Sequence, residues 1–165
     1  MNLIVAVDKN WGIGKDGKLL TYIPEDLKFF KEKTLNSTVI MGRKTFESLP
    51  NSKPLKNRVN IVVTNDTNYK KGGTALVTTI KNAVMIATLL YKDIFVIGGE
   101  SIYKQLLYIC DTAYVTKIDS DFEADTFMVD LDESKEWKVE EESEEKHYND
   151  ISYKFVKYVK KIASN

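Results

Sequence analysis

The segment LLTYIPEDLKFFKEKTL (residues 19–35) places a carboxylate where an apolar side chain is expected. Pro24 suits the first position of a helix, because its missing N–H has no partner there anyway, and Glu25 suits the positive end of the helix dipole. Asp26, however, shares a helix face with Phe30, four residues later. A carboxylate in an apolar setting has a raised pKa unless it is paired, and a ligand edge with two N–H groups could pair with it in bidentate geometry. The alternative is an acid that caps the helix near the surface, and the spacing alone favours neither reading.

Two strand-to-helix junctions carry groups that could bind phosphate. In VIMGRKTFESL (39–49) a buried strand ends at a glycine, and in IFVIGGESIYKQL (94–106) two glycines let the backbone approach a ligand. The candidate groups are Gly42, Arg43, Lys44 and Thr45 at the first junction and Gly98, Gly99 and Ser101 at the second. Neither junction is a dinucleotide fingerprint or a Walker motif. Ligands bind at the carboxyl ends of strands in open α/β sheets, so two such junctions favour a nucleotide or dinucleotide.

Several other polar residues have two readings each. Thr116, in YVTKID, could bond a neighbouring polar group in the central sheet or be an ordinary strand threonine. Arg58 could meet a ligand carboxylate or lie solvated at the start of a strand. His147 is expected at the surface of a polar turn, and Cys110 is expected to pack as a small apolar side chain. Because no nucleophile motif is present, proton or hydride transfer is favoured over covalent catalysis.

Short β-branched runs alternate with helical patterns along the chain. Strands are expected at 3–7, 38–42, 58–64, 75–79, 94–98 and 113–118, and helices at 24–35, 44–49, 80–91 and 101–109. Near-continuous apolar strands between helices indicate a sheet buried on both faces, hence a mainly parallel α/β core. The segments 137–143 and 151–161 alternate more, and they predict an antiparallel hairpin at an edge with its turn at 145–150.

The segment DKNWGIGKDGKLLTY (8–22) is predicted to be neither strand nor helix. It carries Gly12, Gly14 and Gly17 with few apolar anchors. A loop of this length in a compact domain is usually functional, and a lid over a binding site is one common use. A plain surface loop is the alternative.

The composition is that of an ordinary globular protein. Its 165 residues are 43% hydrophobic and 29% charged, and we expect one domain that spans residues 1–165. No apolar run approaches the ~20 residues of a membrane span, and no targeting segment is expected at the start. One cysteine and one histidine cannot form the usual metal clusters, so no metal ligand is expected. The lack of an internal disulfide favours a cytoplasmic protein.

Charge is unevenly distributed along the chain. Nine of the 24 acids but only two of the 24 bases lie within residues 130–145, which leaves seven surplus positive charges elsewhere. Such a field favours a small polyanionic ligand, although each single charge also fits a solvated surface. There is no dense basic stripe with interleaved aromatic residues, so nucleic-acid binding has little support.

Several segments, in order, resemble dihydrofolate reductase of the bacterial chromosomal type. They are LIVAVDKNWGIGKDGKL, PEDLKFFKEKTL, VIMGRKTFESLP, NRVNIVVT, FVIGGESIY, YVTKID and EADTFM, and they cover almost the whole chain. The resemblance implies an eight-stranded mixed, mostly parallel sheet with a C-terminal antiparallel hairpin, flanked by four helices. It also implies that NADPH reduces 7,8-dihydrofolate, with the hydride added at C6 and a proton delivered to N5 through water. Antifolate inhibitors would bind, and the protein would be a monomer.

The resemblance also implies roles for the residues that match the family's motifs. Asp26 would hold N3 and the 2-amino group of the pterin, with Thr116 bonded to it and Tyr103 near the nicotinamide. The other substrate contacts would be Ile4, Val5, Ala6, Leu27, Phe30, Leu49, Leu55, Arg58 and Ile97, with Arg58 on the glutamate α-carboxylate. The cofactor contacts would be Ala6, Ile13, Gly14, Gly42, Arg43, Lys44, Thr45, Thr64, Asn65, Gly98, Gly99, Glu100, Ser101, Ile102 and Tyr103.

The lid and its surroundings carry one match and one departure from the family pattern. Asp125 resembles the acid that steadies the lid through backbone amides around Gly14 and Asp16. Leu20 and Thr21 stand where Pro-Trp is common in the family, so the water network beside the acid is expected to differ.

The cofactor site departs from the family pattern as well. Ser101 stands where a basic residue is often found, and Thr78 stands where another cation can occur. The preference for NADPH over NADH is therefore expected to depend on Arg43 and Lys44.

Two other functions fit parts of the chain. A riboflavin-pathway reductase shares this fold and NADPH chemistry but acts on a ribosylated pyrimidine and does not require the acid of PEDLKFF, so Asp26 argues against it. A non-catalytic nucleotide-binding module would bind the cofactor without turnover. The loss of NADPH absorbance with dihydrofolate separates these functions.

Overall fold

The structure is a computed structural model that describes residues 1–163 of the chain. Its strands are β1 (Asn2–Val7), β2 (Gly12–Gly14), β3 (Thr38–Gly42), β4 (Val59–Val63), β5 (Leu76–Thr78), β6 (Ile94–Gly98), β7 (Thr112–Ile118), β8 (Thr126–Phe127), β9 (Trp137–Glu142), β10 (Lys146–Tyr148) and β11 (Ile151–Lys160). Its α-helices are α1 (Pro24–Thr34), α2 (Arg43–Ser48), α3 (Ile80–Leu89) and α4 (Glu100–Leu106), with short 3-10 helices at Pro50–Ser52 and Leu107–Ile109.

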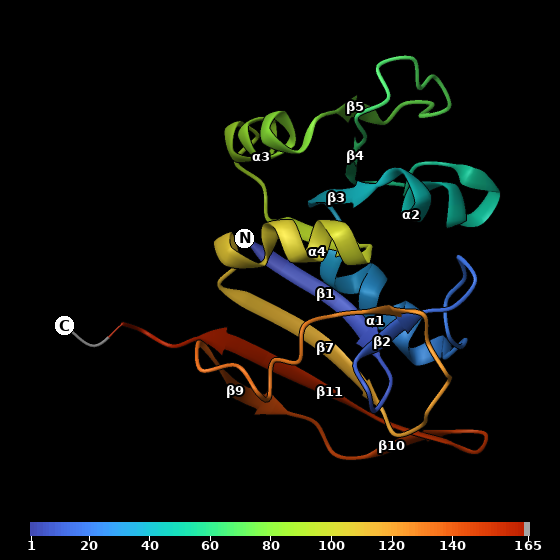
Figure 1. Ribbon diagram of the computed structural model, residues 1–165, viewed down its shortest axis with the longest axis vertical. Coiled ribbons are helices and arrows are strands. Elements are labelled where there is room, and N and C mark those ends of the chain that lie inside the picture. Colours follow the sequence, from blue (N-terminus) through green and yellow to red (C-terminus); the bar gives the residue numbers. More distant parts are fainter. Residues whose placement is uncertain (164–165) are drawn as a thin grey trace.

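One large mixed sheet forms the centre of the molecule (Figure 1). Its strands lie in the order β10, β11, β7, β1, β6, β3, β4, β5, and β9 pairs with β11 as well. All neighbours from β7 to β5 are parallel, whereas β11 is antiparallel to β7, β9 and β10. Because β9 and β10 lie beside successive parts of β11, they occupy one strand position between them. The expected mixed, mostly parallel sheet with its C-terminal hairpin and four helices is confirmed.

Alternate residues of β1 enter different apolar clusters, because successive side chains of a strand point to opposite faces of the sheet. Leu3 and Val7 lie in a cluster that also contains Ala83 of α3 and Ile102 of α4. Ile4 lies in a second cluster, to which α1 and α2 contribute phenylalanines. Figure 1 shows α4 crossing in front of β1. The helix that carries Asp26 therefore packs on the face of the sheet toward which Ile4 points.

Several predicted boundaries differ from the structure by one to three residues, and three differences bear on the elements around the site or the hairpin. The first concerns α2, which begins at Arg43, one residue before the predicted 44–49, because Gly42 is the last extended residue (φ −75°, ψ 162°). The predicted turn at 145–150 contains β10, so the reversal itself is confined to the two residues before Ile151. The predicted loop 8–22 contains β2, which pairs with β8. Strands of two or three residues are too short for an alternating pattern to reveal them.

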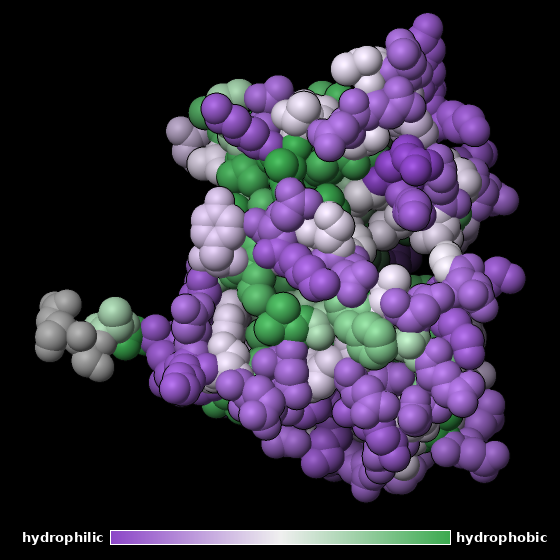
Figure 2. Space-filling model, viewed as in Figure 1, coloured by the Kyte–Doolittle hydropathy of each residue, from purple (hydrophilic) through white to green (hydrophobic). Residues whose placement is uncertain are grey.

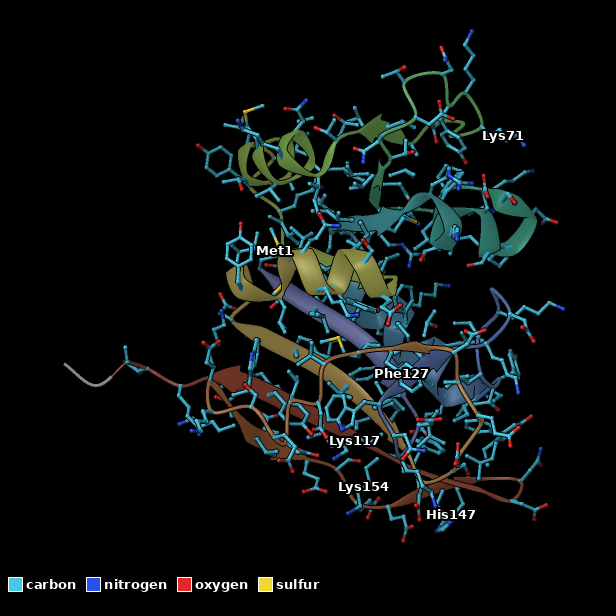
Figure 3. All side chains as sticks on the ribbon, viewed as in Figure 1. Met1, Lys71, Lys117, Phe127, His147 and Lys154 are labelled. Atoms are coloured by element: carbon cyan, nitrogen blue, oxygen red, sulfur yellow. The ribbon has the colours of Figure 1, made fainter. Side chains whose placement is uncertain are left out.

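Cys110 and His147 lie as the sequence predicts. Cys110 is buried in the core, and burial raises the pKa of its thiol to about 11. His147 lies on β10 with its ring exposed, at the bottom of the view and on the far side of the molecule from α2 (Figure 3). Among the helices of residues 1–163, none is both long and apolar enough to cross a membrane.

Candidate active site

Asp26 and Thr116 meet where α1 packs against β7. The side chain of Thr116 is only 2% exposed, and its Oγ1 donates a hydrogen bond to Asp26 Oδ1 at 2.5 Å. The N-cap of α1 is Ile23, and no side chain caps this helix. Burial raises the pKa of Asp26, and the hydrogen bond from Thr116 partly opposes this rise. The reading of Asp26 as an acid that points along the apolar face is confirmed, and the surface-cap reading is wrong.

Tyr103 brings α4 to the same place. Its hydroxyl donates a hydrogen bond to the carbonyl oxygen of Ile4 at 2.8 Å, in the interior of the protein. Burial raises the pKa of Tyr103 far above its ordinary value, and the negative charge of nearby Asp26 raises it further. The structure therefore groups the three residues predicted to be catalytic around the carboxyl half of β1.

The predicted apolar walls gather around the second cluster. Its buried members include Ile4, and the predicted wall residues that pack against it are Phe30, Leu49, Leu55 and Ile97. Leu27, on the same helix as Phe30, leaves 43% of its surface exposed, as a side chain at the edge of an open cleft would.

Two of the predicted substrate residues lie outside this wall. Val5 packs in the opposite cluster, because it follows Ile4 in the strand and points to the other face, so only its backbone is available to this site. Ala6 packs near Ile23 and pairs with Thr116 across β1 and β7.

Arg58 is held at the other end of α1. Its Nη1 donates to Thr34 Oγ1 at 3.0 Å, and its Nε donates to the carbonyl oxygen of Lys56 at 2.9 Å. Burial lowers the pKa of Arg58, although a guanidinium remains charged at any working pH. An anionic group that entered between α1 and the loop before β4 would meet this cation.

The two strand-to-helix junctions lie against each other. A Cβ added to Gly42 would lie 3.1 Å from Ile102 Cγ1, and one added to Gly99 would lie 3.3 Å from Thr45 Oγ1. Gly98 has φ +129°, a conformation that residues with side chains rarely adopt. The glycines thus keep the Thr45 hydroxyl and the start of α2 open to a ligand. Main-chain atoms, a hydroxyl and nearby cations are the chemistry that phosphate requires.

The cations of the first junction differ in their surroundings. Arg43 Nη1 lies 3.1 and 3.3 Å from the two carboxylate oxygens of Glu47, one turn later in α2. Lys44 is exposed, as is Asn65 beyond β4. Thr64 continues the sheet, because its N–H donates to Thr78 O at 3.0 Å. A phosphate at Arg43 would therefore compete with an internal carboxylate.

The polar side chains of the second junction make hydrogen bonds and an ion pair within α4 and a hydrogen bond to β8. Glu100 Oε1 accepts from the N–H of Phe127 at 3.2 Å and lies 3.4 Å from Lys104 Nζ. Ser101 Oγ accepts from Gln105 Nε2 at 2.8 Å. Glu100, predicted among the cofactor contacts, thus contacts the strand that pairs with the lid.

The loop 8–22 is joined to the segment around Asp125. Asp125 Oδ2 accepts from the N–H of Asp16 at 2.8 Å, and the Asp125 N–H donates to Gly14 O at 3.0 Å. Ile13 packs against the main cluster between these ties. The structure thus places Asp125 where the resemblance implied.

Sequence reasoning missed Asp8, which ties down the loop from inside. Its carboxylate is buried and accepts from the N–H groups of Asn10, Gly12 and Phe122, at 2.9, 2.8 and 3.2 Å. Gly12 is required here, because a Cβ would lie 2.9 Å from Asp8 Oδ1. An acid directly after a strand and four residues before a glycine was the available signal.

A second missed group holds the start of α1. Glu25 Oε2 accepts from the hydroxyl of Tyr153 at 2.6 Å, and Glu25 Oε1 lies 3.2 Å from Lys146 Nζ. These two contacts lower the pKa of Glu25. Burial, followed by the contact with Glu25, raises the pKa of Tyr153 to about 12. The residue before Asp26 is thereby anchored to the C-terminal hairpin.

The site lies beside a hollow in the molecular surface. Figure 2 shows this hollow at the right of the view, between the part that carries α2 and the part that carries residues 8–22. Within residues 1–163 no group of three or more metal-ligating side chains is placed to hold an ion. A half-buried carboxylate beside apolar walls, next to two glycine-ended junctions at the ends of parallel strands, is the kind of site with which α/β proteins bind nucleotides.

Comparison with known proteins makes the class specific. The sequence matches the family described as dihydrofolate reductase over residues 1–160. The chain therefore belongs to the dihydrofolate reductase family.

Individual relatives agree with this membership. The dihydrofolate reductase of Bacillus subtilis (strain 168) is 39% identical over 166 residues, which cover 99% of this chain and 96% of the relative. A dihydrofolate reductase type 9 of Escherichia coli is 42% identical over 146 residues, 84% of this chain and 81% of that protein. The solved structure of the Enterococcus faecalis dihydrofolate reductase, complexed with NADP(H) and RAB-propyl, superimposes with a TM-score of 0.85 at 35% identity, covering 96% of this chain and 95% of that one.

Proposed function

We propose that this chain reduces 7,8-dihydrofolate to 5,6,7,8-tetrahydrofolate with NADPH. The observation that carries the proposal is the Asp26 carboxylate, which is half-buried, hydrogen-bonded to the buried Thr116 and raised in pKa by burial. Such a group is costly to bury unless a ligand pairs with it. Membership of the dihydrofolate reductase family supplies the substrate class.

Asp26 holds the pterin and Thr116 holds Asp26. Oδ1 accepts from Thr116 and keeps a second lone pair, so both carboxylate oxygens of Asp26 can accept from the N–C–N–H edge of the pterin, one from N3 and one from the 2-amino group. Two parallel charge-assisted hydrogen bonds to such an edge fix the orientation of the ring. The apolar walls described above enclose the ring and the aminobenzoyl group, and Arg58 pairs with the α-carboxylate of the glutamate.

The residues of the two junctions fit a dinucleotide. Side chains at Gly42 and Gly99 would close the space that main-chain atoms and the Thr45 hydroxyl leave for phosphate. Arg43 and Lys44 would supply positive charge to the phosphates of the dinucleotide, and Thr64 and Asn65 would contact its adenosine end. When bound, NADPH supplies the hydride that adds to C6 of the substrate.

The remaining proton goes to N5 by way of water. Asp26 orients the ring through its far edge, so water admitted at the loop 8–22 delivers the proton to N5. Ile13 and Gly14 of this loop would contact the nicotinamide when the cofactor is bound, and the hydrogen bonds to Asp125 and Asp8 hold the loop in place. Orientation of the two rings and exclusion of bulk solvent are worth several kcal/mol in such a transfer.

The proposal is tested by incubating the purified chain with NADPH and dihydrofolate. We expect NADPH absorbance to fall and tetrahydrofolate to form in equal amounts. Oxidation with a ribosylated aminopyrimidine but not with dihydrofolate would instead indicate a riboflavin-pathway reductase. Binding of NADPH without turnover of either substrate would indicate a non-catalytic module.

We further propose a single-domain, monomeric, cytoplasmic protein that is open to antifolate inhibitors. The single cysteine, buried in the core, suits a reducing compartment. Pterin analogues can present a ring nitrogen and an amino group to Asp26 as the substrate does. Such compounds are therefore expected to compete with dihydrofolate.

A further inference from the structure

Asn60 is a polar residue in a strand position built for an apolar one. It lies in β4, whose other residues are valines and an isoleucine, and it is 5% exposed. Asn60 and Val62 point to the same face, because they are two residues apart, and Val62 is fully buried in the second cluster. Asparagine is disfavoured in strands, and a buried amide costs free energy unless it is hydrogen-bonded.

The amide of Asn60 is bonded to the loop that precedes its own strand. Asn60 Oδ1 accepts from the N–H of Leu55 at 2.9 Å. Asn60 Nδ2 donates to the carbonyl oxygens of Leu55 at 2.9 Å and Arg58 at 3.1 Å. These partners fix which end of the amide is oxygen and which is nitrogen, because the flipped amide would face donor with donor. Both N–H donors of the Asn60 amide are thus hydrogen-bonded to main-chain carbonyl oxygens of one loop.

The loop carries two of the groups assigned above to the tail of the substrate. Leu55 packs against the second cluster beside Phe30 and Leu49, where the aminobenzoyl ring is placed. Arg58 is the cation for the glutamate carboxylate, and its Nε donates a hydrogen bond to the carbonyl oxygen of Lys56, within the same loop. Asn60 bonds the backbone of both Leu55 and Arg58, so it sets the spacing between the apolar and the charged contact.

The geometry points to Asn60 as a positioning residue that determines specificity for substrates with an aminobenzoyl-glutamate tail. The inference rests on the proposed function and adds the residue through which tail recognition is organised. Within residues 1–163, the side-chain hydrogen bonds of Asn60 go only to Leu55 and Arg58, and none goes to a group placed at the pterin ring or at the phosphates. Its loss is therefore expected to weaken recognition of the tail and to leave the reaction of the ring itself unchanged.

The test compares two substrates in one variant. Asn60→Leu keeps a similar side-chain size and removes all three hydrogen bonds. The loss of each bond takes a hydrogen-bond partner from a main-chain group of the loop. We expect KM for dihydrofolate to rise about tenfold or more, with little change in kcat. For a 7,8-dihydropterin that lacks the tail, kcat/KM should stay within about twofold of the unchanged chain, as should Kd for NADPH.

A matched control separates positioning from general loss of stability. Val62→Ala opens a cavity in the same strand and on the same face but breaks no hydrogen bond to the loop. We expect it to lower the free energy of unfolding without changing the ratio of kcat/KM between the two substrates. If Asn60→Leu does not fold, Asn60→Ser, which loses at least one of the three bonds, is measured in the same way.

A double variant checks that Asn60 acts through Arg58. If it does, the losses of dihydrofolate affinity caused by Asn60→Leu and by Arg58→Leu should be less than additive in the double variant, since only the contribution through Leu55 remains once Arg58 is replaced. Equal losses on both substrates, or fully additive losses in the double variant, would overturn the inference while leaving the proposed function in place. An unchanged chain that turns over neither substrate would overturn the proposed function, and the inference with it.

Discussion

Thr116 Oγ1 lies 2.5 Å from Asp26 Oδ1, which joins the first turn of α1 to the middle of β7 across ninety residues of sequence. The bond favours the ionised form of Asp26, whereas burial favours the neutral form. The pKa of Asp26 is raised on balance. The carboxylate is thus poised so that a ligand with N–H donors stabilises its charge.

The first prediction concerns the activity of Asp26→Asn. The amide should fold and bind NADPH but lose most activity at neutral pH, because it cannot balance positive charge on the pterin. Acidification should restore part of the activity, since the substrate then arrives already protonated. The measurement is kcat/KM for dihydrofolate against pH. A loss of only a few-fold that does not vary with pH would contradict the assigned role.

The second prediction concerns the free energy of unfolding, to which the ionised carboxylates of Asp26 and its neighbour Glu25 should contribute with opposite signs. The pKa of Asp26 is raised on folding, so its ionised form costs stability once the pH exceeds the ordinary value of 3.8. The pKa of Glu25 is lowered on folding, so its ionised form contributes stability above the ordinary value of 4.5 and loses it as the pH falls.

Urea denaturation at neutral pH should therefore show Asp26→Asn at least as stable as the unchanged chain. Glu25→Gln should be less stable than the unchanged chain. Both differences should shrink toward pH 3, where the carboxylates are protonated in the unfolded chain. Destabilisation by both substitutions would show that burial is not the dominant influence on Asp26.

The third prediction concerns Thr116→Val, which keeps the shape of the side chain and removes its hydroxyl. Loss of the hydrogen bond lets burial raise the pKa of Asp26 further, so the acid limb of the pH profile of kcat/KM should move to higher pH. At neutral pH kcat/KM should fall about tenfold. Thr112→Val, at the start of the same strand, is the control and should leave the profile unmoved. A loss of activity with no movement of the acid limb would argue that Thr116 does not tune Asp26.

The fourth prediction concerns the choice of cofactor. NADPH differs from NADH by one phosphate, and Arg43 is the guanidinium at the start of α2. Arg43→Gln should weaken NADPH binding by about 1.5–3 kcal/mol, as removal of a charged hydrogen-bond donor does, and should change NADH binding little. Fluorescence titration with both cofactors measures this. Lys154→Gln, on β11, removes a cation elsewhere and serves as the control (Figure 3). Equal weakening for both cofactors would place Arg43 on a phosphate that they share.

The fifth prediction concerns Asp8→Asn. The amide oxygen can still accept from Asn10 and Gly12, but an NH₂ group would then face the N–H of Phe122, donor against donor. We expect a loss of about 1–3 kcal/mol in the free energy of unfolding and faster proteolysis within 8–22. Asp66→Asn changes an exposed acid that accepts only from the N–H of Asn68, so it should cost far less. Equal losses in the two variants would show that the buried hydrogen bonds of Asp8 contribute no more stability than the exposed one of Asp66.

The fold could be predicted from sequence because its strands carry their own signal. The run at 3–7 and the run at 94–98 are apolar throughout, and both become strands of the central sheet. The pair β2–β8 could not be predicted, because its strands have only two or three residues and lie far apart along the chain. The pair β10–β11 was missed because β10 has only three residues and falls within the predicted turn.

The candidate site was predictable only where a residue broke the local pattern. Asp26 interrupts an apolar helix face, so it could be found, and the two glycine-ended strands could be found in the same way. Its partner Thr116 has the ordinary type for a strand, and only the fold brings the two together. Asn60 also interrupts an apolar pattern, in VNIVV, but its partners lie in a loop whose course the sequence does not specify.

The acidic segment 130–145 has a consequence for solubility. It contains β9, which pairs on one side with β11, so its other edge offers unpaired backbone groups that could add a further strand. The carboxylates of Glu140 and Glu142 form ion pairs with Lys157 Nζ and Lys154 Nζ of the neighbouring strand, at 2.7 and 3.0 Å. Two copies that approached by this edge would bring carboxylates together, and like charges oppose such pairing. The same acids that leave the rest of the chain positive thus protect its longest open edge from aggregation.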